Sequence, residues 1–188
     1  MSNPSRASIL VPYDPAWPSL YAAEARRIGE VLEAIALRID HNGSTSVPGL
    51  CAKPIIDIQV SVASLEPLSA YRDPFERLGY THLRHDDDSF APFFFRPHGG
   101  PHSHHVHVVR AGGDEERRTL AFQDYLRANP EVARDYAALK LRLAEQYGYA
   151  TASAREAYAI AKGPFVEAVL KAAQNSSAPF VTAGESNS

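Results

Sequence analysis

The spacing of apolar residues changes repeatedly along the first part of the chain. Apolar positions recur every three to four residues over 17–35, which predicts an amphipathic helix. Two short β-type runs follow, at 38–41 and 55–62. Ser64 is expected to cap a second helix that ends at Gly79. Helices and strands therefore alternate here, as they do in mixed α/β proteins.

The middle of the chain is β-like and rich in aromatic and histidine residues. A third strand is predicted at 80–83, followed by a solvated acidic turn at 85–88. An aromatic run at 90–96 and a histidine-rich run at 104–109 are separated by a Gly/Pro turn at 98–101. We expect these two runs to pair as neighbouring antiparallel strands.

Helical periodicity dominates from about residue 112 onward. Helices are predicted over 115–126, over 130–143, and from 151 or 153 to 170, with a kink or break at Gly163-Pro164.

A length of 188 residues suits one domain. We predict an α/β (α+β) domain over 8–174, made of an α/β core (8–111) and a helical part (112–174). The polar tails, 1–7 and 175–188, are expected to be disordered.

Composition places the chain among ordinary globular proteins, with 45% apolar and 22% charged residues. The net charge of −3 and the absence of a polybasic block argue against nucleic acid or an anionic membrane as partner. The sequence carries no signal-peptide pattern and no apolar run near the roughly 20 residues of a membrane span. The single cysteine, Cys51, is interpreted as structural and fits a reducing compartment, so a cytoplasmic location is expected.

A loop of glycine and hydroxyl residues between two β-type runs is the first candidate site. Gly43, Ser44, Thr45 and Ser46 follow the strand at 38–41 directly. Backbone N–H groups and hydroxyls at such a turn can hold phosphate oxygens. An ordinary turn is the alternative, because Gly-Ser turns are common.

A carboxylate within a buried run is the second candidate feature. Asp57 lies in the strand 55–62, where an unpaired charge would cost several kcal/mol, roughly. We therefore expect Asp57 to be paired or bound to a metal. Strand alternation places Gln59 on the same face as Asp57. A Gly-Ser turn followed by Asp-x-(Asp/Glu) resembles the nucleotidyltransferase superfamily, in which paired carboxylates hold Mg²⁺, but Gln59 departs from that pattern.

Histidines form the third candidate feature. His105 and His107 share one face of the strand at 104–109, and they could converge on Asp57 and Gln59 if the two strands are neighbours. Such a mixed site would suit Mn²⁺, Fe²⁺ or Zn²⁺ better than Mg²⁺. The alternative is that these histidines are half-exposed and bonded to backbone.

Several other polar residues have a functional and an ordinary interpretation. Lys53 could meet a phosphate or be solvated. Tyr158 and Lys162, one helical turn apart, could reach the site or border the core. Glu24 and Arg27 are interpreted as a surface ion pair. His41 is predicted to orient the loop. His102 and His104 are predicted to be solvated.

Five sequence blocks resemble the GrpB family: VPYDPAWP, GSTSVPGL, AKPIID, HHVHVV and LAFQDYLRANPEVARDYAALK. The similarity extends from about Val11 to Val169. It implies a nucleotidyltransferase-like mixed sheet flanked by helices, with a C-terminal helical extension, and a domain also found fused to dephospho-coenzyme A kinase. Gly43 and Ser44 match the phosphate-binding pair of the superfamily and Asp57 its first carboxylate. A histidine stands where the third acid would lie.

The first functional hypothesis is a nucleotidyltransferase that moves a nucleotidyl group from a nucleoside triphosphate to a small acceptor. Asp57 and Lys53 would be catalytic, residues 43–46 would bind phosphate, and Asp57, Gln59, His105 and His107 would hold a divalent metal, Mg²⁺ or Mn²⁺, with Zn²⁺ or Fe²⁺ as alternatives. The competing hypotheses are an inactive nucleotide-binding or phosphometabolite-binding module and a His/Asp metal-dependent enzyme of another class. The predicted partners are small molecules, with a homodimer left open.

Overall fold

The computed structural model describes residues 10–83, 92–149 and 151–177. The predicted acidic turn and the N-terminal tail lie outside the described residues. The predicted C-terminal tail begins too early, because the last helix continues to Ser177.

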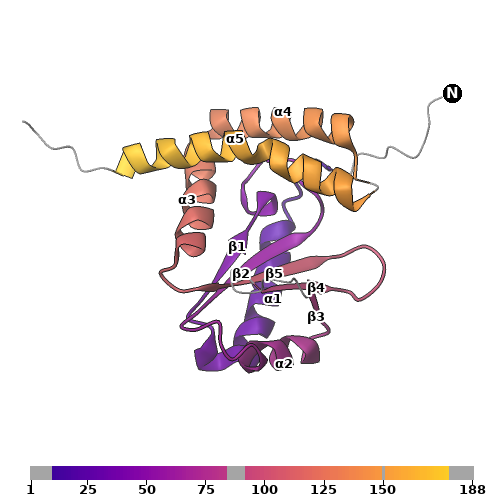
Figure 1. Ribbon diagram of the computed structural model, residues 1–188, viewed down its shortest axis with the longest axis vertical. Coiled ribbons are helices and arrows are strands. Elements are labelled where there is room, and N and C mark those ends of the chain that lie inside the picture. Colours follow the sequence, from indigo (N-terminus) through magenta and orange to yellow (C-terminus); the bar gives the residue numbers. More distant parts are fainter. Residues whose placement is uncertain (1–9, 84–91, 150, 178–188) are drawn as a thin grey trace, which may run out of the picture.

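A five-stranded mixed sheet forms the centre of the molecule (Figure 1). The two central strands run parallel to each other, and the other neighbours are antiparallel. In spatial order the strands are β1 (Arg38–Asn42), β2 (Ile56–Val62), β5 (His104–Arg110), β4 (Phe93–Arg96) and β3 (Thr81–Leu83).

The pairing of β5 confirms one prediction and fulfils the condition attached to another. Its antiparallel neighbour is the aromatic strand β4. Its parallel neighbour is β2, with Asp57 beside His105 and Gln59 beside His107. The polar residues of the two central strands therefore form adjacent pairs on one face of the sheet.

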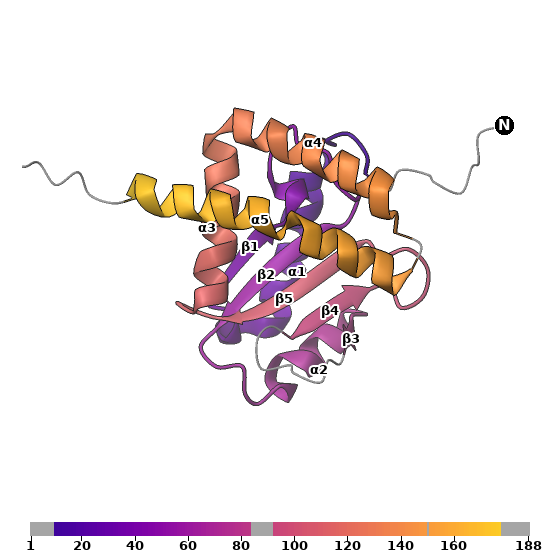
Figure 2. The same cartoon turned by 45° about the horizontal axis from the view of Figure 1, so that its top comes forward.

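Helices cover both faces of the sheet. In the described part of the chain the α-helices are α1 (Trp17–Leu32), α2 (Ser69–Arg77), α3 (Asp114–Ala128), α4 (Pro130–Tyr147) and α5 (Ala152–Ser177). The main core lies between the sheet and α1 and α2, where Ile58, Val60 and Val106 are fully buried. The opposite face carries Asp57 and Gln59, and the three C-terminal helices lie over it (Figures 1 and 2).

Two helix predictions need correction. The helix predicted from Ser64 begins at Ser69, because Ser64 instead hydrogen-bonds the backbone of Glu66 and Pro67 disfavours helix before it. The first helix ends at Leu32 and continues only as a 3₁₀ turn, η2 (Glu33–Ile35). At Gly163-Pro164 the last helix bends but does not break (Figure 2).

The prediction that Glu24 and Arg27 form a surface ion pair also needs correction, because Glu24 is buried. Its side chain is 3% exposed. One carboxylate oxygen accepts a hydrogen bond from the Tyr80 hydroxyl at 3.0 Å, and the other pairs with Arg96 and Arg27. This cluster ties α1 to the strand edge at β3 and β4. A buried carboxylate tolerates burial only when it is paired and hydrogen-bonded in this way.

We predict that Glu24→Ala lowers the free energy of unfolding by about 3 kcal/mol, because it leaves the partly buried Arg96 without its partner. The matched control is Arg27→Ala, which removes the 46% exposed arm of the same cluster and should cost less than about 1 kcal/mol. Urea unfolding of both variants measures the difference. Equal losses would contradict a buried network.

Candidate functional site

The turn after β1 is shaped by a glycine that lies against Asp57. Gly43 has φ of 68°, and a Cβ atom there would lie 2.4 Å from Asp57 Oδ2. The strand register brings the two together, because Asn42 pairs directly with Asp57. A residue with a side chain would be strained and would displace the carboxylate. Glycine is therefore required for the turn to sit on Asp57.

The hydroxyl residues of this turn form the short 3₁₀ helix η3 (Ser44–Ser46) and have different partners. Ser46 Oγ donates to Gln123 of α3 at 2.6 Å and contacts the Gly43 carbonyl oxygen. Thr45 Oγ1 lies 3.0 Å from His41 Nε2, a contact that agrees with the loop-orienting role predicted for His41. Ser44 Oγ accepts from Lys140 Nζ at 3.0 Å and borders two cavities. Of the three hydroxyls, that of Ser44 is best placed to meet a ligand.

Asp57 is paired with a histidine, as its position in the strand suggested. Asp57 Oδ1 lies 3.1 Å from His105 Nδ1, and His105 Nε2 lies 3.0 Å from His102 Nδ1. His102 also stacks on Phe95, with ring centroids 4.3 Å apart. Both ring nitrogens of His105 therefore already have partners.

The prediction that His102 and His104 are solvated needs correction. Both side chains are half-buried. His102 is bonded to His105, as described above. His104 lies 2.9 Å from Ser103 Oγ, and burial, with the nearby Arg96 charge, lowers the pKa of His104 to about 4. Its imidazole is therefore neutral at pH 7.

Gln59 and His107 share the face of Asp57 but do not line its cavity. Gln59 is fully buried, and Thr119 of α3 donates to its amide oxygen at 2.6 Å. His107 packs on Phe93, with ring centroids 4.9 Å apart, and desolvation lowers its pKa. Among the four residues predicted as metal ligands, Asp57 and His105 reach the cavity. Across the described residues, no three His, Cys, Asp or Glu side chains are grouped to hold a metal ion.

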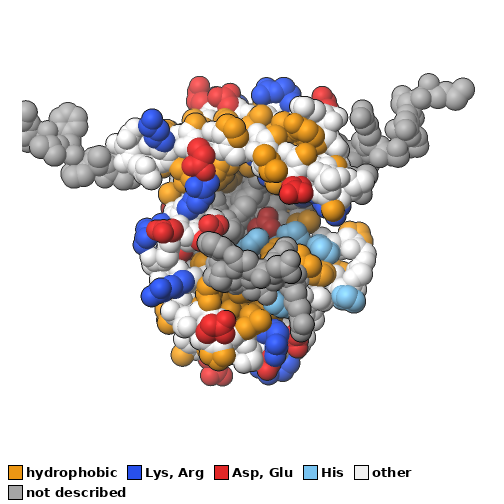
Figure 3. Space-filling model, in the orientation of Figure 1, with side chains coloured by type: hydrophobic (Ala, Val, Ile, Leu, Met, Phe, Trp, Pro, Cys, Tyr) orange, Lys and Arg blue, Asp and Glu red, His pale blue; other side chains and the backbone are white. Residues whose placement is uncertain are grey.

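A cavity of about 230 Å³ lies over Asp57 and His105 and is closed by the helical part of the chain. We call it the cationic cavity. Figure 3 shows the molecule hollowed between the upper helices and the sheet, with histidine side chains at the lower edge. Besides Ser44, Thr45 and the Asp57–His105 pair, its polar lining consists of Lys53, Lys140, Arg155, Tyr158 and Lys162. Tyr158 and Lys162 therefore reach the site, which was one of their two interpretations; the other was that they border the core.

The lysines of the cationic cavity are buried or half-buried and lie against aromatic rings. Lys53 Nζ lies 4.0 Å from the Tyr149 ring centroid, and Lys162 Nζ lies 4.6 Å from that of Tyr158. Lys140 is 2% exposed and donates to Ser44 Oγ and to the Cys51 carbonyl oxygen. Desolvation lowers the pKa of all three lysines, that of Lys140 to about 8.

These three lysines also lack a counter-charge of their own. Within the described ranges, no carboxylate lies within 4.0 Å of the amino group of Lys53, Lys140 or Lys162. With Arg155, four cationic side chains surround the single carboxylate of the cavity. Gathering uncompensated positive charge in a desolvated space is unfavourable unless an anion enters. The arrangement is suited to an anionic ligand.

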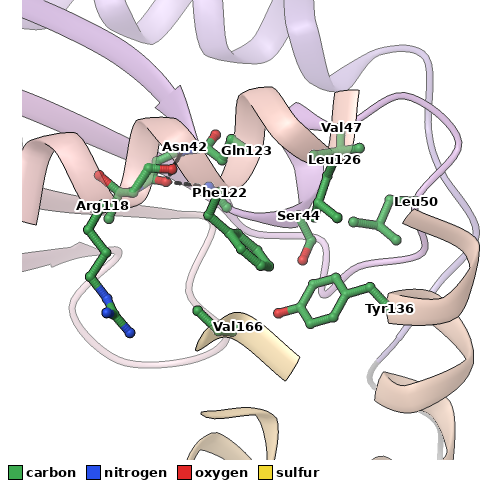
Figure 4. Close-up of a pocket in the computed structure, with 12 residues that line it drawn as sticks. Asn42, Ser44, Val47, Leu50, Arg118, Phe122, Gln123, Leu126, Tyr136 and Val166 are labelled. Atoms are coloured by element: carbon green, nitrogen blue, oxygen red, sulfur yellow. Dashed lines mark hydrogen bonds between the residues drawn. The ribbon is translucent and has the colours of Figure 1, made fainter. Parts of the chain in front are cut away.

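A second cavity, of about 130 Å³, adjoins the first at Ser44. We call it the apolar pocket (Figure 4). It lies between the Gly43–Ser44 turn and the C-terminal helices. Phe122 of α3 and Tyr136 of α4 meet edge to face across it, with ring centroids 5.3 Å apart. Its other apolar lining residues are Val47, Leu50, Leu126 and Val166.

Sequence reasoning missed Lys140, Arg155 and the apolar pocket. Lys140 offered a signal, because it stands four residues after Tyr136, within the predicted apolar stripe of its helix. A lysine on the buried face of a helix is rare enough to indicate a partner or a site. Arg155 offered no comparable signal.

The fold and site define a mixed α/β protein whose C-terminal helices close a cationic cavity over a Gly-Ser turn and one carboxylate. The family model described as GrpB protein matches residues 8–172. The chain belongs to the GrpB family.

Known relatives extend this assignment. The UPF0157 protein BH1888 of Halalkalibacterium halodurans is 41% identical over 173 residues, covering 91% of this chain and 85% of the relative. A crystal structure of the conserved protein GrpB from Enterococcus faecalis matches with a TM-score of 0.76 and 34% identity, over 89% of this chain and 98% of that one. The dephospho-CoA kinase of Mycobacterium tuberculosis is 35% identical over 161 residues, 70% of this chain but 38% of the kinase. The described helices include none that is long and apolar enough to cross a membrane.

We predict that Gly43→Ala costs about 3 kcal/mol of stability, from positive φ and from the clash with Asp57. Gly49→Ala is the control: φ there is 77°, but nothing lies within 4 Å of the added Cβ, so the cost should be about 1 kcal/mol. In an Asp57→Ala background the contacts with the carboxylate are gone and only the 3.0 Å contact with Cβ remains, so Gly43→Ala should cost less than it does in the wild type. Urea unfolding of the four variants tests this coupling, and additive losses would contradict it.

The lowered pKa of Lys140 predicts a pH-dependent stability. Between about pH 8, its pKa in the folded protein, and pH 10.5, its ordinary pKa, the folded lysine is neutral while the unfolded one is still charged. The unfolded state then binds more protons, so stability rises with pH. Relative to Lys140→Met, the wild type should gain about 2.5 kcal/mol between pH 8 and 10.5. Denaturant unfolding at several pH values measures this, and a constant difference would be the contrary result.

Proposed function

We propose that this GrpB protein binds the polyphosphate of a nucleoside triphosphate in the cationic cavity and transfers a nucleotidyl group to a small acceptor. The observation that carries this proposal is the ring of four cationic side chains around one carboxylate. It occurs in a chain whose net charge is −3, so the positive charge is local. Polyphosphates are among the small ligands with enough negative charge to match such a ring.

The residues of the cavity take distinct parts in this proposal. The Ser44 hydroxyl and the Gly43–Ser44 backbone would meet phosphate oxygens, while Thr45 and Ser46 keep the turn in shape through their bonds to His41 and Gln123. Lys53 and Lys162 would neutralise the charge that develops as a phosphoryl bond breaks. Partial desolvation of Lys53 and Lys162 strengthens these interactions, because charges attract more strongly where less water screens them.

A divalent cation fits the site only together with the ligand. Mg²⁺ in nucleotide enzymes is commonly held by one or two carboxylates plus substrate phosphates, and Asp57 provides one such carboxylate. Mg²⁺ or Mn²⁺ bound there would supply charge neutralisation on the phosphates. The histidines fit Zn²⁺ or Fe²⁺ less well, because both nitrogens of His105 are engaged and His107 lies outside the cavity lining. Asp57, together with the phosphates of the nucleotide, would therefore hold the cation.

A binding module without transfer chemistry is the second candidate function. It is favoured by Gln59, whose amide oxygen is bound to Thr119 and which replaces the usual second acid. Both candidates bind nucleotide, but the transferase alone releases pyrophosphate. Because the mycobacterial relative is named a dephospho-CoA kinase, dephospho-coenzyme A is an acceptor to test.

We expect a thermal shift with ATP and Mg²⁺ that depends on the cavity. Ligand at about 100 times its dissociation constant should add roughly 2.7 kcal/mol, or several degrees. Lys162→Ala should weaken binding at least about tenfold, the equivalent of one lost charged contact. Asp57→Asn should remove the Mg²⁺-dependent part of the shift. Lys171→Ala, an exposed lysine on the same helix, should change nothing.

The outcomes separate the two candidates. Pyrophosphate release that is lost in Asp57→Asn supports transfer, whereas binding without release supports the module. No shift with any nucleoside triphosphate, or a shift that Lys162→Ala leaves intact, would overturn both.

A further inference from the structure

The helices α4 and α5 each line both cavities. On α4, Tyr136 lines the apolar pocket and Lys140 the cationic cavity; on α5, Val166 and Lys162 do the same. Each pair is four residues apart, so its members share a helix face and lie about 6 Å apart along the axis. The two cavities therefore lie next to each other beneath the same helices. Ser44 lines both of them.

The apolar pocket offers mainly carbon surface to a ligand. The amide groups at its inner end are already used: Gln123 Nε2 donates to Asn42 Oδ1, and Gln123 Oε1 accepts from Ser46. Figure 4 shows this bonded pair on one side of the pocket, with Phe122 and Val166 facing the open space. Both of those side chains are only half-buried, so the pocket is reachable from outside. Apolar surface of this kind gains free energy when a ligand covers it.

An exposed ion pair joins α3 to α5 beside this pocket. Arg118 of α3 lines the pocket and pairs with Glu167 of α5, the residue after Val166. The helix that carries Lys162 over the cationic cavity thus also borders the apolar one. Any ligand that enters beneath α5 meets the two surfaces together.

We propose that the apolar pocket takes the apolar or aromatic body of the same phosphorylated ligand whose phosphates occupy the cationic cavity. The substrate is then an elongated amphiphile that extends from one cavity to the other past Ser44. This inference rests on the proposed function, since it needs phosphate in the cationic cavity. The body can be the base of a nucleotide or an alkyl group, and binding measurements distinguish them.

The test compares ligands with and without a body by isothermal titration calorimetry. Inorganic tripolyphosphate carries more negative charge than ATP, so electrostatics alone would favour tripolyphosphate. We expect ATP to bind at least about tenfold tighter in spite of this. Octyl phosphate, compared with inorganic phosphate, tests the alkyl alternative in the same way.

A variant that fills the apolar pocket tests whether this pocket causes the tighter binding of ligands that carry a body. Val166→Phe should remove the advantage of the body-bearing ligand and leave tripolyphosphate binding unchanged within about twofold. Ile160→Phe, at a position on α5 that is 69% exposed, is the matched control and should keep the advantage. Val166→Leu, a smaller change, should reduce it in part and provides a second variant if Val166→Phe fails to fold, as judged by circular dichroism.

Each outcome has a separate meaning. If bare phosphates bind the wild type as tightly as ATP and octyl phosphate do, or if Val166→Phe weakens every ligand equally, the inference is wrong and the proposed phosphate site stands. If tripolyphosphate does not bind the wild type at all, the proposed function fails, and this inference fails with it.

Discussion

The close contact between Gly43 and Asp57 is the constraint on which the candidate site depends. The antiparallel register of β1 and β2 sets Asn42 opposite Asp57, so the chain must turn directly above a carboxylate. A residue without a Cβ atom is what allows this turn. Once the turn is in place, Ser44 faces the helices while Thr45 and Ser46 fasten it to His41 and Gln123. The position of the site thus follows from backbone geometry as much as from charge.

The C-terminal helices give this turn its chemical character. Without α4 and α5 the carboxylate and the turn would face water, where charges interact weakly. The helices add cations and remove solvent together, because Lys140 and Lys162 lie on their inward faces beside aromatic rings. The lowered pKa values of these lysines record that desolvation. An anion that enters the cavity offsets the unfavourable free energy of this desolvation.

Sequence patterns predicted more of the fold than of the site. Strand alternation correctly placed Asp57 and Gln59 on one face, whereas the neighbourhood of the histidine-rich strand and β2 was only a condition that the structure fulfils. Alternation cannot show which part of a face another element covers, and α3 covers Gln59 while leaving Asp57 open. Alternation also gives no information about contacts between residues that are far apart in the sequence. Glu24 meets Arg96 over 72 residues, and Lys140 meets Ser44 over 96.

The parallel pairing of β2 with β5 has a consequence for how the protein folds. Asp57 and His105 are adjacent in space but 48 residues apart in the chain, with α2, β3 and β4 between them. Parallel strands cannot be joined by a short hairpin, so this pairing closes a long loop before it gains any contact. Contacts of high sequence separation form slowly. We therefore expect the pairing of β2 with β5, beside which the candidate site lies, to form after the local hairpin of β4 and β5.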